Sequence, residues 1–278
     1  MAQAREELLA LVAGVRPELH RYCARLTGSV IEGEDIVQDT LAKAFYAMSQ
    51  TVEVPPLRPW LFRIAHNTAI DFLRARGRRQ TEPTAEIDDI AGYDDTPDPI
   101  VVRAALARFV GLPLTQRSAV ILKDVLGHSL EETAETMGTT VLAVKAALVR
   151  GRKSLRDDAR DENEPTSSAR GELERYATLF NARDWDGVRT LIADDCRLDL
   201  VTKSQRRGKE VGMYFGNYAK LDVRLRVVRV DGELALAAHV GDAAAPAYFV
   251  LLAFEGGKVV GIRDYKYVPY ITVDATIE

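Results

Sequence analysis

The segment SLEETAETMGTTVLAVKAALVRGR, from Ser129 to Arg152, has the residue types and spacing of a helix-turn-helix that binds DNA. Gly138 can adopt the positive φ that a sharp break requires, and Thr140 is placed to cap a second helix. One buried stripe is predicted at i, i+3, i+4 and i+7: Leu130, Thr133, Ala134 and Met137. The second helix continues an apolar face with Val141, Val144 and Leu148, and carries charge that attracts phosphate at Lys145, Arg150, Arg152, Lys153 and Arg156. An ordinary helical hairpin with a solvated basic end has the same pattern, so the rest of the chain must decide.

A second basic helix is predicted in WLFRIAHNTAIDFLRARGRR. Polar residues recur on one side at Arg63, Asn67, Ile70 or Asp71, and Arg74, opposite the apolar Leu61, Ile64, Ala65, Thr68 and Phe72. The helix ends in Arg76, Arg78 and Arg79, and this front suits a nucleic-acid backbone with polar reading of bases. Trp60 could help to form a pocket for an unstacked base, although an aromatic at helical spacing more often packs in the core.

A third helix is expected from about Glu34 to Ser49, burying Ile36, Val37, Thr40, Leu41, Ala44, Phe45 and Met48. Its polar side carries Glu34, Asp35, Gln38 and Asp39. Paired carboxylates can serve metal or acid–base chemistry, but no histidine joins these, so a solvated or protein-docking face is the better interpretation. Cys23 and Cys196 are too far apart in sequence to indicate a disulfide framework or a zinc site. We therefore predict neither a metal nor a cofactor.

Charge is segregated along the 278 residues, although the net charge is only -4. The stretch from Arg58 to Arg79 is basic and the stretch from Thr81 to Pro99 is acidic, which excludes a uniformly basic nucleic-acid coat and predicts modules joined by an acidic linker. No apolar run approaches the roughly 20 residues that a membrane span needs, and the N-terminus does not resemble a signal peptide. We expect a soluble, cytoplasmic protein that does not bind a membrane.

The predicted organisation is multidomain. Residues 1–80 are helical, 81–99 form the acidic linker, 100–157 are helical, 158–170 form a polar linker, and 171–278 form an α+β domain. Helices are expected in 100–157 at Ile100–Val110 and about Thr115–Leu126 before the helix-turn-helix. The last domain should contain helices at Leu173–Phe180 and Trp185–Ile192, then strands at Leu221–Val230, Glu233–His239, Ala247–Phe254 and Val259–Tyr267. We expect a curved antiparallel sheet folded over the helices.

Three blocks, GEDIVQDTLAKAFYA, RPWLFRIAHNTAIDFLRARGRR and LPLTQRSAVILKDVLGHSLEETAETMGTTVLAVKAALVRGRKSLR, together resemble the extracytoplasmic-function sigma factors of bacterial RNA polymerase. The resemblance covers about residues 10–157 and implies a region 2 domain and a region 4 helix-turn-helix domain. It implies that core polymerase is bound through the β′ clamp helices, by Asp35, Gln38 and Asp39, and through the β flap. The minus-ten element would be melted and read by Trp60, Arg63, Asn67, Arg74 and Arg76. The minus-thirty-five element would be read by Thr140, Val141, Ala143, Val144, Lys145, Arg150 and Arg152. In many relatives a Ser-Arg pair stands where this chain has Ala146 and Ala147, so a hydroxyl and a guanidinium are lost there.

The C-terminal stretches RYATLFNARDWDGVRTLIADDCRLDL, RRGKEVGMYF and VVGIRDYKYVPY resemble SnoaL-like domains of the NTF2-like superfamily, which implies a cone of curved sheet wrapped by helices. Some relatives are enzymes, and the residues to consider for catalysis are Asp199, Tyr214, His239, Tyr248 and Asp264. A fold does not by itself determine a function, so the enzymes among the relatives do not make this domain an enzyme. We predict a regulatory domain that can bind a small-molecule ligand, and we predict no catalytic residues.

The sequence thus predicts a promoter-specificity subunit whose partners are core RNA polymerase and promoter DNA, modulated by its C-terminal domain. Two alternatives remain. One is a stand-alone helix-turn-helix regulator, which would leave the two upstream helices without a purpose. The other is a small-molecule enzyme in the C-terminal domain, which predicts turnover that depends on Asp264 or His239.

Overall fold

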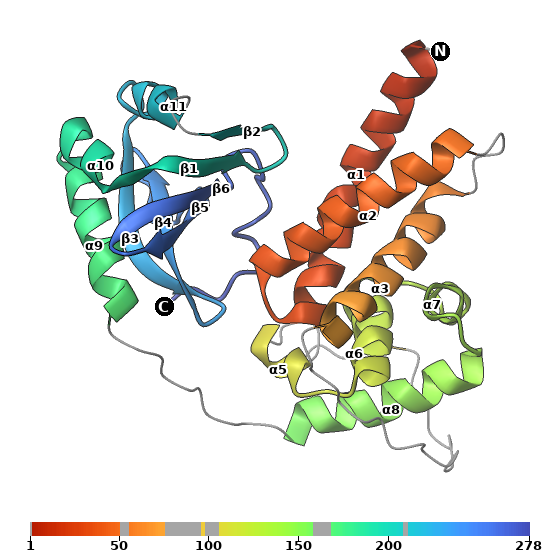
Figure 1. Cartoon of the computed structure of the whole chain (residues 1–278). Helices are drawn as coiled ribbons and strands as arrows, with labels where there is room; N and C mark the ends of the chain where they lie inside the picture. The colour runs from red at the N-terminus through yellow and green to blue at the C-terminus, as the bar shows by residue number, and fades with distance from the viewer. Residues whose placement is uncertain (1, 51–55, 76–95, 98–105, 158–167, 208–210) are drawn as a thin grey trace. The chain divides into compact units, whose positions relative to one another are not determined.

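The computed structural model describes residues 2–50, 56–75, 96–97, 106–157, 168–207 and 211–278. The chain divides into two compact units, Met1–Asp161 and Glu162–Glu278. The described residues of the first unit form helices and no strand, and those of the second form helices and one sheet, so the predicted fold class, helical domains followed by an α+β domain, is confirmed (Figure 1). Within the described residues, no helix has the length and apolar character to cross a membrane.

The helical unit begins with three long helices, α1 (Ala2–Thr27), α2 (Val30–Gln50) and α3 (Leu57–Ala75). Helix α1 ends where predicted, because Gly28 takes a φ of 82° and reverses the chain within two residues. Helix α2 therefore starts at Val30, earlier than expected. The buried side chains of α2 end at Ala44, so the prediction that Phe45 is buried was wrong, and its side chain is exposed.

The described residues of this unit also form α5 (Leu106–Val110), α6 (Leu114–Val120), the π-helical turn η1 (Ile121–Val125), α7 (Leu130–Met137) and α8 (Val141–Asp157). One continuous hydrophobic core draws on both halves of the unit, from Val12 to Leu155. The buried guanidinium of Arg117 in α6 donates hydrogen bonds to the carbonyl oxygens of Leu26 and Leu112, at 2.5 and 2.8 Å. A charged side chain thus satisfies one carbonyl in the last turn of α1, which lies far away in sequence.

The second unit starts with helices α9 (Ser168–Asn181) and α10 (Trp185–Leu191). Its sheet contains β1 (Ile192–Leu200), β2 (Ser204–Arg207), β3 (Val223–Val230), β4 (Glu233–Val240), β5 (Tyr248–Glu255) and β6 (Lys258–Asp264), with helix α11 (Val211–Tyr218) between β2 and β3. The strand order is β2-β1-β6-β5-β4-β3. The four predicted strands are present, whereas β1, β2 and α11 were not foreseen.

The expectation of an antiparallel sheet was wrong at one position, because β1 pairs with β6 in parallel. Leu198 lies opposite Ile262 in this pair. A parallel pair needs a long crossover, and here the rest of the unit, from β2 to β5, supplies that connection.

Aromatic side chains of the helices pack closely in the interior of the second unit. Phe180 meets Trp185 and Tyr218 edge to face, each with ring centroids 5.2 Å apart. Tyr176 stacks on Phe180 at 6.2 Å, and Phe215 is also buried. Such pairs add about 0.5–1.5 kcal/mol each beyond burial, so this region is a packed core.

Candidate nucleic-acid and polymerase interfaces

The first helix of the helix-turn-helix is fixed by local hydrogen bonds. The Ser129 hydroxyl accepts from the Glu132 amide at 3.0 Å, and the Glu132 carboxylate accepts from the Ser129 amide at 2.8 Å. This capping box satisfies two amides that have no partner inside the helix. The hydrogen bond from the Ser129 amide lowers the pKa of Glu132. Helix α7 ends at Gly138, whose φ is 62°, as the sequence predicts.

The second helix, α8, begins after Thr140, whose hydroxyl accepts from the Ala143 amide at 3.2 Å. Thr140 is exposed, and Ala143 and Lys145 are half-buried. Val141 is half-buried against the hydrophobic core, and Arg150 is exposed. The start of this helix therefore presents a hydroxyl and an ammonium group, with a guanidinium further along.

Two residues predicted to contact the minus-thirty-five element point elsewhere. Val144 is fully buried, because it completes the apolar face of α8 against the core. Arg152 is only 7% exposed. Its Nε donates to Oδ2 of Asp124 at 2.9 Å, and its Nη2 donates to Oδ1 at 2.6 Å. This two-pronged pair holds the guanidinium in the protein interior, so neither Val144 nor Arg152 lies on the exposed surface of α8.

Ala146 and Ala147, which replace the Ser-Arg pair of many relatives, are 8% and 1% exposed. Both side chains thus belong mainly to the buried side of α8. The replacement of the Ser-Arg pair by two alanines therefore changes the packing of α8 as well as its surface.

Helix α3 presents one polar stripe. Arg63, Asn67 and Arg74 are exposed, as is Asp71, and their spacing places them along one side of the helix. The apolar side is buried at Leu61, Ala65 and Thr68, with Ile64 and Phe72 half-buried. Trp60 is half-buried and packs against the core, in agreement with the core alternative, and Arg76 lies outside the described residues.

The inner side of α3 carries a buried histidine. Nδ1 of His66 lies 2.7 Å from the Tyr22 hydroxyl. Burial penalises the imidazolium and lowers the pKa of His66 to about 4. The same cause lowers the pKa of His128 to about 4, where the ring meets the Phe62 ring edge to face at 4.7 Å.

The polar side of α2 is narrower than predicted. Asp39 is exposed and Asp35 and Gln38 are half-buried. Glu34 was expected on this side but is fully buried, because it pairs with Arg16 of α1.

Tyr46 was not among the predicted residues of this surface, yet its side chain is 72% exposed. Tyr46 follows Asp35 and Asp39 at helical spacing, on the same side of α2. The only hint in the sequence was a phenol ring next to Phe45 near the end of an amphipathic helix.

In the second unit, Asp264 lies at the centre of a buried hydrogen-bond network. Its Oδ2 accepts from the hydroxyls of Tyr214 and Tyr218 at 3.0 and 2.7 Å, and its Oδ1 accepts from the Lys266 amide at 2.8 Å. The Tyr218 hydroxyl also lies 2.8 Å from that of Tyr248. Burial raises the pKa of Asp264, while these hydrogen bonds act in the opposite direction. A fully buried carboxylate with three donors serves as a structural centre for the surrounding tyrosines.

The other two residues considered for catalysis are not in this network. Asp199 lies opposite Arg263 in the β1–β6 pair, so strand alternation places it on the other face of the sheet from Asp264. His239 is on that other face too, and its Nδ1 lies 3.1 Å from the carbonyl oxygen of Ala243. The five candidates are therefore divided between two faces. Within the part of the chain that the structure describes, no group of acidic, histidine or cysteine residues could hold a metal ion.

Comparison with known proteins gives the same picture of the helical unit. Residues 11–79 match the Sigma-70 region 2 family, and residues 103–155 match the Sigma-70, region 4 family. The RNA polymerase sigma factor SigG of Mycobacterium tuberculosis is 32% identical over 62% of this chain, and the match spans 55% of that relative's length. Among solved structures, the sigma factor SigJ of Mycobacterium tuberculosis is similar over 92% of this chain and 95% of that one, at 23% identity and a TM-score of 0.38.

The RNA polymerase sigma-E factor of Haemophilus influenzae is 31% identical, over 44% of this chain and 71% of that protein. A relationship of this extent covers more than two thirds of that sigma factor. The chain belongs to the extracytoplasmic-function sigma factors of RNA polymerase.

Proposed function

We propose that this protein is a promoter-specificity subunit that directs core RNA polymerase to particular promoters and starts transcription there. One observation carries the proposal: a single helical unit presents both the exposed stripe of Arg63, Asn67 and Arg74 and a capped helix-turn-helix with Lys145 and Arg150. The first surface suits single-stranded DNA and the second suits duplex DNA. A stand-alone regulator needs only the second.

The minus-ten element would contact α3 through Trp60, Arg63, Asn67, Arg74 and Arg76. The minus-thirty-five element would contact the start of α8 through Thr140, Val141, Ala143 and Lys145, and a phosphate would contact Arg150. Val144 and Arg152 are omitted from this set because they are buried. The division into a region 2 domain (1–80), a region 4 domain (100–157) and a C-terminal domain (171–278) is part of the same proposal.

Core polymerase would bind the polar side of α2, through Asp35, Gln38 and Asp39 on the β′ clamp helices, with the β flap as the second contact. Tyr46 extends this surface with an exposed ring, and a tyrosine beside carboxylates is well suited to a protein interface. The protein would act in the cytoplasm, where core polymerase works.

The SnoaL-like C-terminal domain would modulate this activity, and we propose that it does so by binding a small molecule. Sigma factors are not enzymes, and the division of the five candidate residues between two faces supports a role without turnover.

Run-off transcription with core polymerase tests the proposal. The full chain should direct initiation at a discrete position, and the Asp35→Ala/Asp39→Ala variant should lose both core binding and transcripts. The matched control, Asp194→Ala/Asp195→Ala, removes two exposed acids from β1 and should bind core normally. A full chain that binds promoter DNA but never core polymerase would refute the proposal in favour of a stand-alone regulator.

A further inference from the structure

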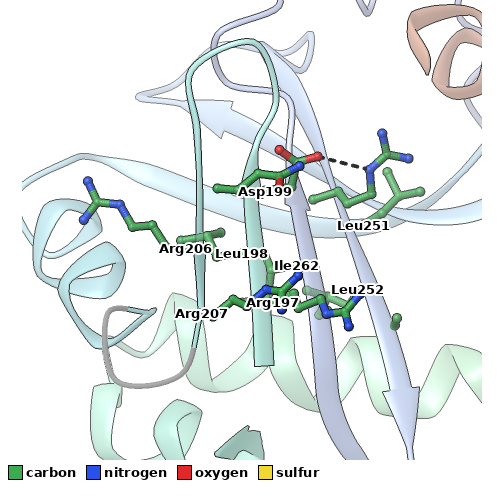
Figure 2. Close-up of a pocket in the computed structure, with 12 residues that line it drawn as sticks. Arg197, Leu198, Asp199, Arg206, Arg207, Leu251, Leu252 and Ile262 are labelled. Carbon is green, nitrogen blue, oxygen red and sulfur yellow. Dashed lines mark ion pairs between the residues drawn. The ribbon is translucent and has the colours of Figure 1, made fainter. Parts of the chain in front are cut away.

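A pocket of about 430 Å³ opens on the face of the sheet opposite Asp264 (Figure 2). Its lining comes from β1, β2, β5 and β6. Pockets for small molecules measure roughly 300–1,000 Å³, so this one has room for a compact ligand. Its charged lining consists of four arginines and one acid: Arg197, Arg206, Arg207, Arg263 and Asp199.

One row of residues across the four strands lines the pocket. Arg207 on β2 is the partner of Arg197 on β1, Arg197 is the partner of Gly261 on β6, and Gly261 is the partner of Ala253 on β5. The row thus places two cations side by side at one end and the two smallest side chains at the other. The missing side-chain volume at Gly261 and Ala253 hollows the sheet beside the arginines.

The neighbouring row closes one end of the pocket. It runs from Gln205 through Asp199 and Arg263 to Leu251. Nε of Arg263 lies 3.8 Å from Oδ2 of Asp199, as the dashed line in Figure 2 marks. The acid of the pocket thus lies beside Arg263, and Leu251 adds an apolar wall.

Arg197 and Arg207 remain without such a neutralising group. Both are exposed, and among the described residues no carboxylate forms an ion pair with either one. Like charges directly opposite each other in a sheet are destabilising, and an oxyanion bound between them would remove that repulsion. Arg206 extends away from this pair in Figure 2, as strand alternation requires.

We propose that this pocket binds a small organic oxyanion, a carboxylate or phosphate on an apolar body. Arg197 and Arg207 would bind the oxyanion, and the hollow at Gly261 and Ala253, with Leu251, would bury the apolar part. The site deepens the regulatory role proposed for the C-terminal domain and rests on that role for its consequence in transcription. Binding itself is measured without polymerase, so a failure here leaves the sigma-factor proposal intact.

Isothermal titration calorimetry of the full chain tests this with three probes: octanoate, octyl phosphate and inorganic phosphate. The two amphipathic probes distinguish a carboxylate from a phosphate head group, and at least one of them should bind saturably at one site. Inorganic phosphate should bind at least about tenfold more weakly, because it leaves the hollow at Gly261 and Ala253 empty.

Variants separate the two parts of the site. Arg197→Gln/Arg207→Gln should weaken binding about tenfold or more, because charge-assisted hydrogen bonds are removed. The matched control is Arg224→Gln/Arg226→Gln, which removes two exposed arginines from β3, outside the pocket, and should bind as the unchanged protein does. Ala253→Phe fills the hollow from an exposed position and should abolish binding of the amphipathic probes.

Three results would overturn the proposal. The first is the absence of saturable binding by octanoate and octyl phosphate. The second is binding that is equal in the Arg197→Gln/Arg207→Gln and Arg224→Gln/Arg226→Gln proteins. The third is affinity for duplex DNA that depends on Arg197 and Arg207 without any affinity for the two probes, which would assign these arginines to a nucleic-acid backbone.

Discussion

The guanidinium of Arg152 and the carboxylate of Asp124 form a two-pronged ion pair, with hydrogen bonds of 2.9 and 2.6 Å, inside the part of the helical unit that matches sigma region 4. The side chain of Asp124 is fully buried and that of Arg152 is 8% exposed. The pair joins the π-helical turn η1 to helix α8, the second helix of the helix-turn-helix. It thus holds helix α8 against the rest of the helical unit.

We expect Asp124→Asn to destabilise the helical unit by about 3–5 kcal/mol, because it leaves a buried guanidinium without its counter-charge. In a Trp185→Phe background Trp60 is the single tryptophan, so urea unfolding followed by its fluorescence reports on this unit. The control Arg150→Gln changes an exposed residue of the same helix and should stay within about 0.5 kcal/mol. Equal unfolding midpoints for the two variants would show that the pair does not stabilise the unit.

Lys145 and Arg150 should behave differently from Arg152. Replacing both by Gln should weaken binding to promoter duplex, because fewer phosphates are then neutralised by the protein. The slope of log affinity against log salt should become shallower by about 1 for each phosphate that is no longer neutralised. Fluorescence anisotropy at several salt concentrations measures this slope.

The control for this experiment is Arg224→Gln/Arg226→Gln, with the same loss of charge in the other unit. A salt slope that changes equally in both proteins would mean that net charge alone, rather than α8, determines binding.

The helix-turn-helix could be predicted because its determinants are local. The Ser129–Glu132 capping box, the positive φ of Gly138 and the Thr140 cap each involve residues three or fewer positions apart, or a single residue. The buried state of Arg152 could not be predicted in this way, since its partner Asp124 lies 28 residues earlier. A basic residue in a basic helix looks the same in sequence whether it faces DNA or a buried acid.

The sheet shows the same limit. Strands β3 to β6 were predicted because turn residues separate them, whereas β1 was missed because its charged residues, Asp194, Asp195 and Arg197, obscure the apolar alternation. Its parallel pairing with β6 joins residues about sixty positions apart, such as Leu198 and Ile262, and no local pattern encodes that. The pocket of arginines, which depends on this pairing, was therefore not predictable.

Gly33 should be required for the close packing of α1 and α2. A Cβ at this position would lie 2.6 Å from the backbone nitrogen of Ala24, so Gly33→Ala must push the helices apart. We expect a loss of about 1–3 kcal/mol in the Trp60 unfolding assay, although alanine is the better helix former by about 1 kcal/mol.

Gly14 provides the matched control, because it is exposed within α1 and a Cβ there would meet nothing within 4 Å. Gly14→Ala should stabilise the unit by up to about 1 kcal/mol. If Gly33→Ala also stabilised the protein, helices α1 and α2 would not approach each other closely at Gly33, and the prediction would be contradicted.

His66 should make the helical unit less stable in mild acid. Its folded pKa of about 4 lies below the ordinary value of 6.5, so the unfolded chain binds the proton more readily. The stability that neutral His66 confers is complete above pH 6.5, falls as the pH decreases below 6.5, and levels off below about pH 4. The loss between pH 7 and pH 5 should be about 2 kcal/mol for this residue.

His128 has the same shift in pKa and should add a similar dependence of stability on pH. The difference between the urea midpoints at pH 7 and pH 5, followed by Trp60 fluorescence, should therefore be smaller in His66→Gln than in the unchanged protein. It should be smaller still in His66→Gln/His128→Gln. An unaltered pH dependence in the double variant would mean that both rings accept a proton in the folded state, and that burial beside Tyr22 and Phe62 does not exclude the imidazolium.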